Sequence, residues 1–212
     1  MTRPAPHLYL ITDRKACGGI PALLDIAGRV ADALPPGSLA VQVREKDLPP
    51  RDVIALARAL VARLAAHGAP VLVNERFDLA IAAGAAGVHL STFGMPPADV
   101  RGAYDGLVAV STHSPAELAA LCPGDADFAV FGPVFDTPSK RPYGPPVGID
   151  ALRRAVAASP IPVVALGGIR TGNAGLLAGT GAAGIATISA VLGAPDPVQA
   201  ARVLLEAAER CG

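Results

Sequence analysis

The segment Gln42-Val-Arg-Glu-Lys46 carries two cations and an amide side by side. It continues the apolar run that begins at Leu39, so it reads as the polar end of a β-strand. Side chains alternate along a strand, which places Gln42 and Arg44 on one side, with Lys46 just beyond. Two cations and an amide donor suit a phosphate or a diphosphate. The segment predicts an anion site, and the alternative is a solvated basic strand end.

A second candidate anion site lies near the carboxyl end of the chain. Gly167 and Gly168 follow an apolar run, and Ile188 and Ser189 follow the next one. Glycine lets backbone N–H groups approach an anion closely, and a helix that begins nearby adds a favourable dipole. These four residues predict a phosphate site, whereas the simpler alternative is a glycine pair that only makes a tight turn.

Two histidines follow or end apolar runs, and they favour different roles. His113 stands in Ser111-Thr-His-Ser114, directly after a predicted strand. A histidine at such a place suits a general acid–base, because its ordinary pKa is about 6.5. The alternative is that His113 only caps the next helix. His89 lies between Val88 and Leu90, which favours a hydrogen-bonded histidine of the core.

A long loop, residues 132–148, interrupts the pattern after the apolar run 127–131. It contains five prolines, which restrict the unfolded loop and favour an ordered conformation. Loops of this length in compact domains are usually functional or disordered. Thr137, Ser139 and Lys140 together suit an anion, so we expect an active-site loop; the alternative is a proline-rich surface excursion.

These residues need elements to position them, and the chain alternates short apolar runs with helical patterns. We expect strands at 7–12, 39–44, 70–74, 87–90, 107–110, 127–131, 161–166 and 184–187. Helices are expected at 20–34, 52–67, 77–83, 97–103, 115–121, 149–158, 173–179 and 196–210. Continuously apolar strands indicate a parallel sheet covered by helices. Eight such units predict a single-domain (β/α)8 TIM barrel over residues 1–212.

An open doubly wound sheet is the alternative fold, but no GxGxxG follows the first strand. In a barrel, the carboxyl ends of the strands form one ring where active sites lie. Polar residues stand at nearly every strand end, including Asn74, Glu75 and Ser111. A barrel built only for packing does not need them, so the ring predicts an enzyme.

The composition excludes several other classes of protein. Eighteen Lys and Arg balance eighteen Asp and Glu, and binding to nucleic acid without sequence preference needs a basic face. No uninterrupted apolar run approaches the roughly 18 residues of a membrane span. The three cysteines are widely spaced and without metal-site spacing, which fits a reduced cytoplasm. We expect a cytoplasmic enzyme that binds a small phosphorylated molecule, with neither nucleic acid nor membrane as partner.

Seven segments in register resemble the thiamin phosphate synthase/TenI family. They span about residues 8 to 190 and read LYLITD, VQVREK, VNER, GVHL, VSTHS, FGPVFDTPSK and ALGGI. The family contains a synthase, which joins hydroxymethylpyrimidine diphosphate to thiazole phosphate, and TenI-type proteins, which bind the same thiazole phosphate and, where active, tautomerise its carboxylated precursor. The resemblance also makes a homodimer plausible.

For the synthase, the resemblance implies binding roles for residues already singled out. Gln42, Arg44, Lys46 and Asn74 would lie near the diphosphate, and Lys140 would act over the pocket with Thr137 and Ser139. Gly168 and Ser189 would hold the thiazole phosphate.

The chain departs from the synthase pattern where two aspartates hold Mg²⁺ on the diphosphate. Glu75 replaces one of them and Gly94 the other. Loss of a carboxylate should weaken a Mg²⁺ site, since Mg²⁺ depends on carboxylate and phosphate oxygens. Tautomerisation needs neither metal nor leaving group, so we expect a thiazole tautomerase without a cofactor, with His113 as its acid–base. A Mg²⁺-dependent synthase that uses Glu75 is the close alternative, and a non-catalytic binder or regulator of the pathway is the third.

Overall fold

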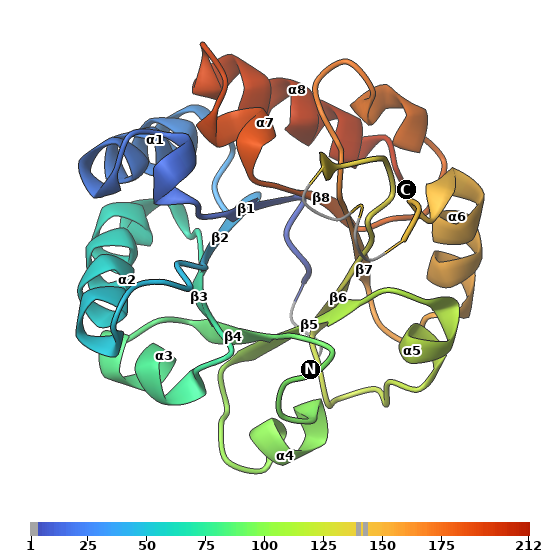
Figure 1. Cartoon of the computed structure of the whole chain (residues 1–212), viewed down its shortest axis with the longest axis horizontal. Coiled ribbons are helices and arrows are strands. Elements are labelled where there is room, and N and C mark those ends of the chain that lie inside the picture. Colours follow the sequence, from blue (N-terminus) through green and yellow to red (C-terminus); the bar gives the residue numbers. More distant parts are fainter. Residues whose placement is uncertain (1–3, 139–140, 142–143) are drawn as a thin grey trace.

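Eight parallel strands close into a barrel in which each strand pairs with its neighbours in chain order (Figure 1). The computed structural model describes residues 4–138, 141 and 144–212. The strands are β1 (Leu8–Ile11), β2 (Leu39–Val43), β3 (Val71–Asn74), β4 (Gly87–Leu90), β5 (Leu107–Thr112), β6 (Phe128–Phe131), β7 (Val163–Leu166) and β8 (Gly184–Thr187). The predicted TIM barrel is therefore confirmed; five strands are one or two residues shorter than expected, and β5 is two residues longer.

Helices surround the barrel on its outer side (Figure 1). They are α1 (Ile20–Ala33), α2 (Pro50–Leu64), α3 (Phe77–Ala83), α4 (Pro97–Arg101), α5 (Pro115–Ala119), α6 (Gly148–Ala158), α7 (Ser189–Leu192) and α8 (Pro197–Glu209). Short 3₁₀ turns form η1 (Arg14–Ala16), η2 (Ala65–His67) and η4 (Ala174–Leu177). Among the helices within the described ranges, none has the length and apolar character needed to cross a bilayer.

The helix expected at 173–179 is wrong, since this segment forms only the turn η4. Glycines at 175 and 179 weaken a helix here, and Gly179 adopts a left-handed φ of 66° that ends the turn. The short helix α7 was not expected, because its four residues are too few to show a helical period.

The apolar residues divide into two shells, as the alternation of side chains along each strand requires. One shell packs between strands and helices, and it contains residues such as Leu8, Leu10 and Val41. The other fills the barrel interior and consists of Tyr9, Ile11, Ala40, Leu72, Ala109, Phe128, Val130, Val164 and Ala186. Burial on both faces explains why the strands read as continuous apolar runs, and it leaves their polar ends at one rim.

Candidate active site

The end of β2 presents a polar face to the barrel mouth. Gln42 is 1% exposed, and its Nε2 donates to Oδ1 of Asn74 on β3 at 3.3 Å. The backbone N–H of Arg44 donates to Thr12 Oγ1 at 2.9 Å, which ties the strand end to the segment after β1. Gln42 and Arg44 have the same parity as Ala40 in the interior cluster, so they continue its inward face. The structure thus joins Gln42 to Asn74 by a hydrogen bond and places Arg44 on the same inward face as Gln42.

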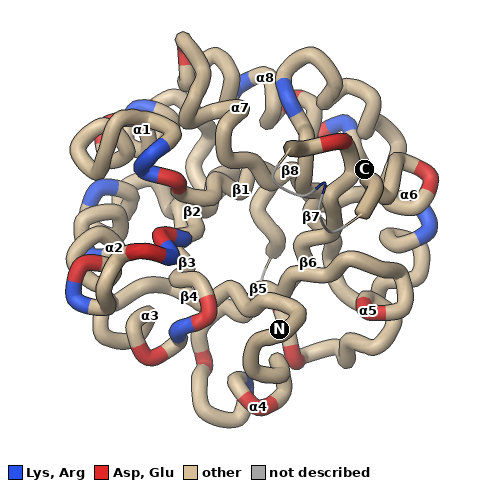
Figure 2. Tube along the Cα trace, viewed as in Figure 1, with Lys and Arg blue, Asp and Glu red and all other residues tan. Residues whose placement is uncertain are grey.

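Arg14, next to this face, is already paired with carboxylates, whereas among the described residues the cations predicted to bind an anion, Arg44 and Lys46, are not. Arg14 contacts the buried carboxylate of Glu45 at 2.8 Å and the carboxylate of Asp47 at 2.6 Å. These hydrogen bonds from Arg14 hold the pKa of Asp47 well below its usual range. Within the part of the chain that the structure describes, neither Arg44 nor Lys46 forms an ion pair. Their positive charge is left for a ligand, and Figure 2 shows charged residues gathered beside β2 and β3.

Glu75 adopts an unusual backbone conformation directly after β3. Its φ is +63°, a left-handed value that is uncommon for residues other than glycine and is often found at functional sites. Its N–H donates to the carbonyl of His89 at 2.8 Å, and its Oε1 accepts from the N–H of Ser91 at 2.6 Å. A Cβ at Gly94 would lie only 2.4 Å from its Oε2. The Glu75 carboxylate therefore occupies the space that a side chain at position 94 would need.

This single carboxylate limits which metal sites are possible. Among the described residues, no group of three acidic, histidine or cysteine side chains could enclose a metal ion. Mg²⁺, however, commonly binds through one or two carboxylates while substrate phosphates and water supply its other ligands. Glu75 fits a Mg²⁺ ion of that kind, because Oε1 is engaged by Ser91 and Oε2 is available.

His89 is a core residue, as its apolar neighbours in the sequence predicted. Its ring lies inside the barrel, 3% exposed, with Nδ1 at 3.1 Å from the Tyr9 hydroxyl and Nε2 at 2.9 Å from Ser111 Oγ. Burial, together with the positive charge of Arg44, lowers the pKa of His89 to about 3. His89 is thus a neutral, satisfied core residue.

His113, in contrast, lies exposed at the mouth, two residues beyond Ser111 on the inward face. Its Nδ1 lies 2.6 Å from the carbonyl of Gly132. A carbonyl can only accept, so Nδ1 carries a proton and Nε2 of the neutral ring remains a base. Its backbone N–H donates to Glu117, next to the cap of α5, so the residue also supports the helix start. Both predicted roles of His113 are compatible with this geometry.

The two ends of the long loop after β6 are held together by backbone hydrogen bonds. We call these ends, residues 133–135 and 147, the neck of the loop. The N–H groups of Val134 and Phe135 donate to the carbonyls of Leu166 and Gly167 at 2.8 and 2.9 Å. The N–H of Val147 returns to the carbonyl of Pro133 at 2.8 Å. Thr137 is half-buried, while the predicted residues Ser139 and Lys140 lie outside the residues that the structure describes.

The neck explains why two glycines follow β7. Gly167 has a φ of 101° and Gly168 a φ of 65°. A Cβ on Gly167 would lie 2.4 Å from Pro133 Cα, and one on Gly168 would lie 2.6 Å from the carbonyl oxygen of Asp136. Both glycines are therefore required by the close packing of the loop, independently of any phosphate that they bind.

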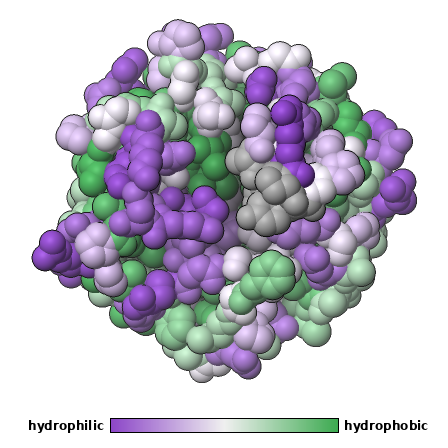
Figure 3. All heavy atoms as spheres, in the orientation of Figure 1, coloured by the Kyte–Doolittle hydropathy of each residue, from purple (hydrophilic) through white to green (hydrophobic). Residues whose placement is uncertain are grey.

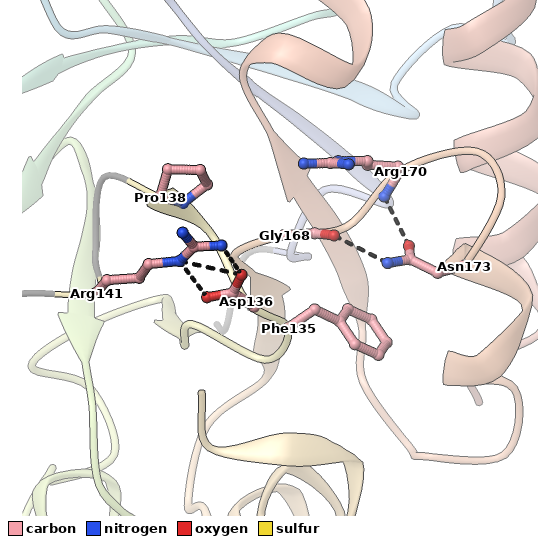
Figure 4. Close-up of a pocket in the computed structure, with 7 residues that line it drawn as sticks. All are labelled: Phe135, Asp136, Pro138, Arg141, Gly168, Arg170 and Asn173. Carbon is pink, nitrogen blue, oxygen red and sulfur yellow. Dashed lines mark hydrogen bonds and ion pairs between the residues drawn. The ribbon is translucent and has the colours of Figure 1, made fainter. Parts of the chain in front are cut away.

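A cavity of about 370 Å³ lies beside this neck (Figure 4). It is lined by Phe135, Asp136, Pro138, Arg141, Gly168, Arg170 and Asn173. Asn173 bridges two of these residues, since its Nδ2 donates to the Gly168 carbonyl and its Oδ1 accepts from the Arg170 N–H. Arg141 pairs with Asp136 at 2.6 Å, whereas Arg170 forms no ion pair among the described residues.

Sequence reasoning missed Arg170 and Asn173. A cation two residues beyond the glycine pair was the available signal. Ile188 is half-buried against the interior cluster, and Ser189 is the first residue of α7.

The two predicted anion sites lie on opposite sides of the mouth, at β2–β3 and at β7–β8 (Figure 1). Figure 3 shows hydrophilic residues gathered beside a central hollow between them. Lys46 and Asn74 also line a smaller cavity of about 240 Å³ next to β2 and β3. Cationic side chains thus stand near the mouth at β2–β3, and backbone groups and Arg170 lie near it at β7.

Comparisons with known proteins agree on one family. A family model described as thiamine monophosphate synthase matches residues 8–191. The chain is 48% identical over 200 residues to a putative thiamine-phosphate synthase of Geobacter sulfurreducens, covering 93% of this chain and 92% of that protein. It is 40% identical to a thiamine-phosphate synthase of Roseiflexus castenholzii, covering 98% and 93%.

Solved structures extend this similarity. A thiamine phosphate pyrophosphorylase of Pyrococcus furiosus superimposes with a TM-score of 0.82 at 32% identity, over 96% of both chains. A 3-hexulose-6-phosphate synthase of Salmonella typhimurium, at 19% identity and a TM-score of 0.73, shares the fold alone.

Proposed function

The chain belongs to the thiamine monophosphate synthase family, and from this premise we propose that it joins hydroxymethylpyrimidine diphosphate to thiazole phosphate. The observation that carries the proposal is the pair of anion-suited regions on opposite sides of one mouth. A tautomerase would bind one thiazole phosphate that also carries a carboxylate, whereas two cations and an amide donor on one side suit a diphosphate. Coupling brings a diphosphate and a phosphate together, so it uses both regions. The names of the relatives support the synthase over the tautomerase that the sequence favoured.

In the proposed reaction, the bond between the pyrimidine methylene carbon and the diphosphate oxygen breaks, and the electron pair leaves with the oxygen. The lone pair of the thiazole nitrogen then forms the new carbon–nitrogen bond. Arg44 and Lys46 would stabilise the charge that grows on the leaving diphosphate, while Gln42 and Asn74 would orient it. No proton needs to move in this step, so His113 is not required for it.

Glu75 is the residue that would hold Mg²⁺ in this site. When bound, Mg²⁺ neutralises charge on the diphosphate and makes it a better leaving group. The hydrogen bond from Ser91 to Oε1 holds the carboxylate in place, so its second oxygen is presented without further ordering.

Turnover of the purified protein tests the proposal. We expect thiamin phosphate from hydroxymethylpyrimidine diphosphate and thiazole phosphate with Mg²⁺, and none after chelation with EDTA. Glu75→Gln keeps an oxygen for the Ser91 N–H but loses the charge, so it should raise the Mg²⁺ concentration for half-maximal rate by about tenfold or more. Absence of thiamin phosphate at saturating Mg²⁺ would refute the proposed function.

The tautomerase remains the second candidate because of the geometry of His113. Its Nδ1 is held by the Gly132 carbonyl, which leaves Nε2 exposed to the mouth as a base. Metal-independent conversion of the thiazole carboxylate tautomer, lost in His113→Ala, would establish this activity. Under the synthase proposal, His113→Ala retains coupling.

A further inference from the structure

A chain of hydrogen bonds crosses the barrel interior from β1 through β4 to β5. The Tyr9 hydroxyl lies 3.1 Å from His89 Nδ1, and His89 Nε2 lies 2.9 Å from Ser111 Oγ. The Tyr9 and His89 rings are stacked, with centroids 5.7 Å apart and an angle of 14° between their planes. Tyr9 is 0% exposed and His89 3%, whereas Ser111 is only half-buried. The chain therefore begins in the dry interior and ends at the mouth.

The direction of this chain follows from the buried end. Burial raises the pKa of Tyr9 well above its ordinary value, so the phenol keeps its hydrogen. Among the described residues, His89 Nδ1 is the only acceptor that this hydrogen reaches. A hydroxyl left without an acceptor in the interior is costly, so Nδ1 must be free of hydrogen. The neutral ring then carries its hydrogen on Nε2 and donates to Ser111.

The direction of these hydrogen bonds determines what Ser111 can do at the mouth. Ser111 Oγ accepts from His89, which leaves the hydroxyl hydrogen of Ser111 to be donated elsewhere. In the described part of the chain, Ser111 Oγ has no other hydrogen-bond partner. With the opposite direction, Ser111 would donate to His89 and could offer a ligand only its lone pairs.

We propose that Tyr9 and His89 are positioning residues that fix the Ser111 hydroxyl as a hydrogen-bond donor toward an acceptor atom of the bound substrate. The kinetic part of this inference rests on the proposed function, with hydroxymethylpyrimidine diphosphate as that substrate.

The tautomer of His89 can be observed directly in the free protein. The chain has four histidines, and ¹⁵N NMR of histidine-labelled protein distinguishes the two neutral tautomers. We expect the Nε2–H form for His89. His113 provides the internal contrast, because its contact with the Gly132 carbonyl requires hydrogen on Nδ1. His89→Gln assigns the signal, and an Nδ1–H form of His89 would overturn the proposal.

A double-mutant cycle tests whether Tyr9 acts through Ser111. We expect Tyr9→Phe and Ser111→Ala each to raise KM for hydroxymethylpyrimidine diphosphate by about tenfold, as loss of one hydrogen bond can do. Tyr9→Phe added to Ser111→Ala should have little further effect. Independent, multiplying effects would contradict the coupling.

Val164→Ala serves as the structural control, since it creates a cavity in the same interior cluster but leaves the hydrogen bonds of Tyr9, His89 and Ser111 (the relay) in place. It should lower thermal stability and leave KM unchanged; a KM increase equal to that of Tyr9→Phe would reduce the effect to packing and overturn the inference. The NMR measurement needs no turnover, so an inactive protein would refute the proposed function while the tautomer still decides this proposal.

Discussion

The two sides of the barrel mouth are built in different ways. At β2–β3, side chains on strand ends face the mouth, and Arg44 and Lys46 carry charges that no described residue pairs. At β6–β7, backbone groups dominate, and Gly132, Gly167 and Gly168 let the loop pack directly onto the strand end. Substitutions on the first side should change binding and catalysis, whereas an added side chain on the second should first change folding.

The largest effect is expected from Gly168→Ala. The new Cβ would lie 2.6 Å from the carbonyl oxygen of Asp136, and φ of +65° is unfavourable for alanine. The Cβ would also lie 2.7 Å from the carbonyl group of Phe135, and these backbone atoms cannot move aside as a flexible side chain can. We expect a loss of about 3 kcal/mol or more in the free energy of unfolding, measured in urea.

Gly172→Ala is the matched control, since it lies in the same connection and its Cβ would meet no atom within 4 Å. It should change stability by less than about 0.5 kcal/mol. Equal destabilisation by both variants would show that the close packing of the neck does not govern the β7 end.

Arg44→Gln tests the other side of the mouth. The charge is lost while hydrogen-bond donors remain, so the leaving diphosphate is less well stabilised. We expect kcat/KM for coupling to fall about 100-fold, with unfolding midpoints unchanged. Arg202→Gln, an exposed arginine on α8, should leave both quantities unchanged. A variant that is mainly destabilised would remove the contrast between the two sides.

The fold was predictable because its strands are buried on both faces and separated by clear breaks. The positions of Gln42, Arg44 and Asn74 were also predictable, since parity along a strand and position at its end decide which side chains face the mouth. Contacts between segments that are distant in the sequence could not be predicted from it. The contact of Glu75 with Gly94 and that of Gly168 with Asp136 join residues whose approach depends on the folded loops. The direction of the relay through His89 likewise depends on three strands meeting in space.

The buried His89 should make the free energy of unfolding depend on pH. The pKa of His89 is about 3 in the folded protein, against about 6.5 for an unperturbed histidine. Between these values the unfolded chain binds a proton that the native state excludes. Its contribution is therefore fully present above pH 6.5 and is lost as pH falls, at up to about 1.4 kcal/mol per pH unit.

Urea unfolding between pH 7 and 4.5 measures this slope before most carboxylates titrate. The groups that act on the His89 ring are Tyr9 and Ser111, which form hydrogen bonds with it, and Arg44, whose positive charge contributes to its low pKa. His89→Gln should flatten the slope, whereas His7→Gln, at an exposed histidine, should keep it. An unchanged slope in His89→Gln would place the acid sensitivity elsewhere.

The smallest expected effect is a difference in KM between variants of two arginines that line the cavity beside the neck (Figure 4). Arg170 forms no ion pair among the described residues, and its backbone is fixed through Asn173. Arg141 is held by Asp136, and that exposed pair leaves less of its charge for a ligand. We expect Arg170→Gln to raise KM for thiazole phosphate about tenfold, and Arg141→Gln less than threefold. Because Asp136→Asn frees Arg141 without removing it, this third variant should lower KM slightly. If Arg141→Gln were the more damaging change, the phosphate would have to be assigned to the loop rather than to the end of β7.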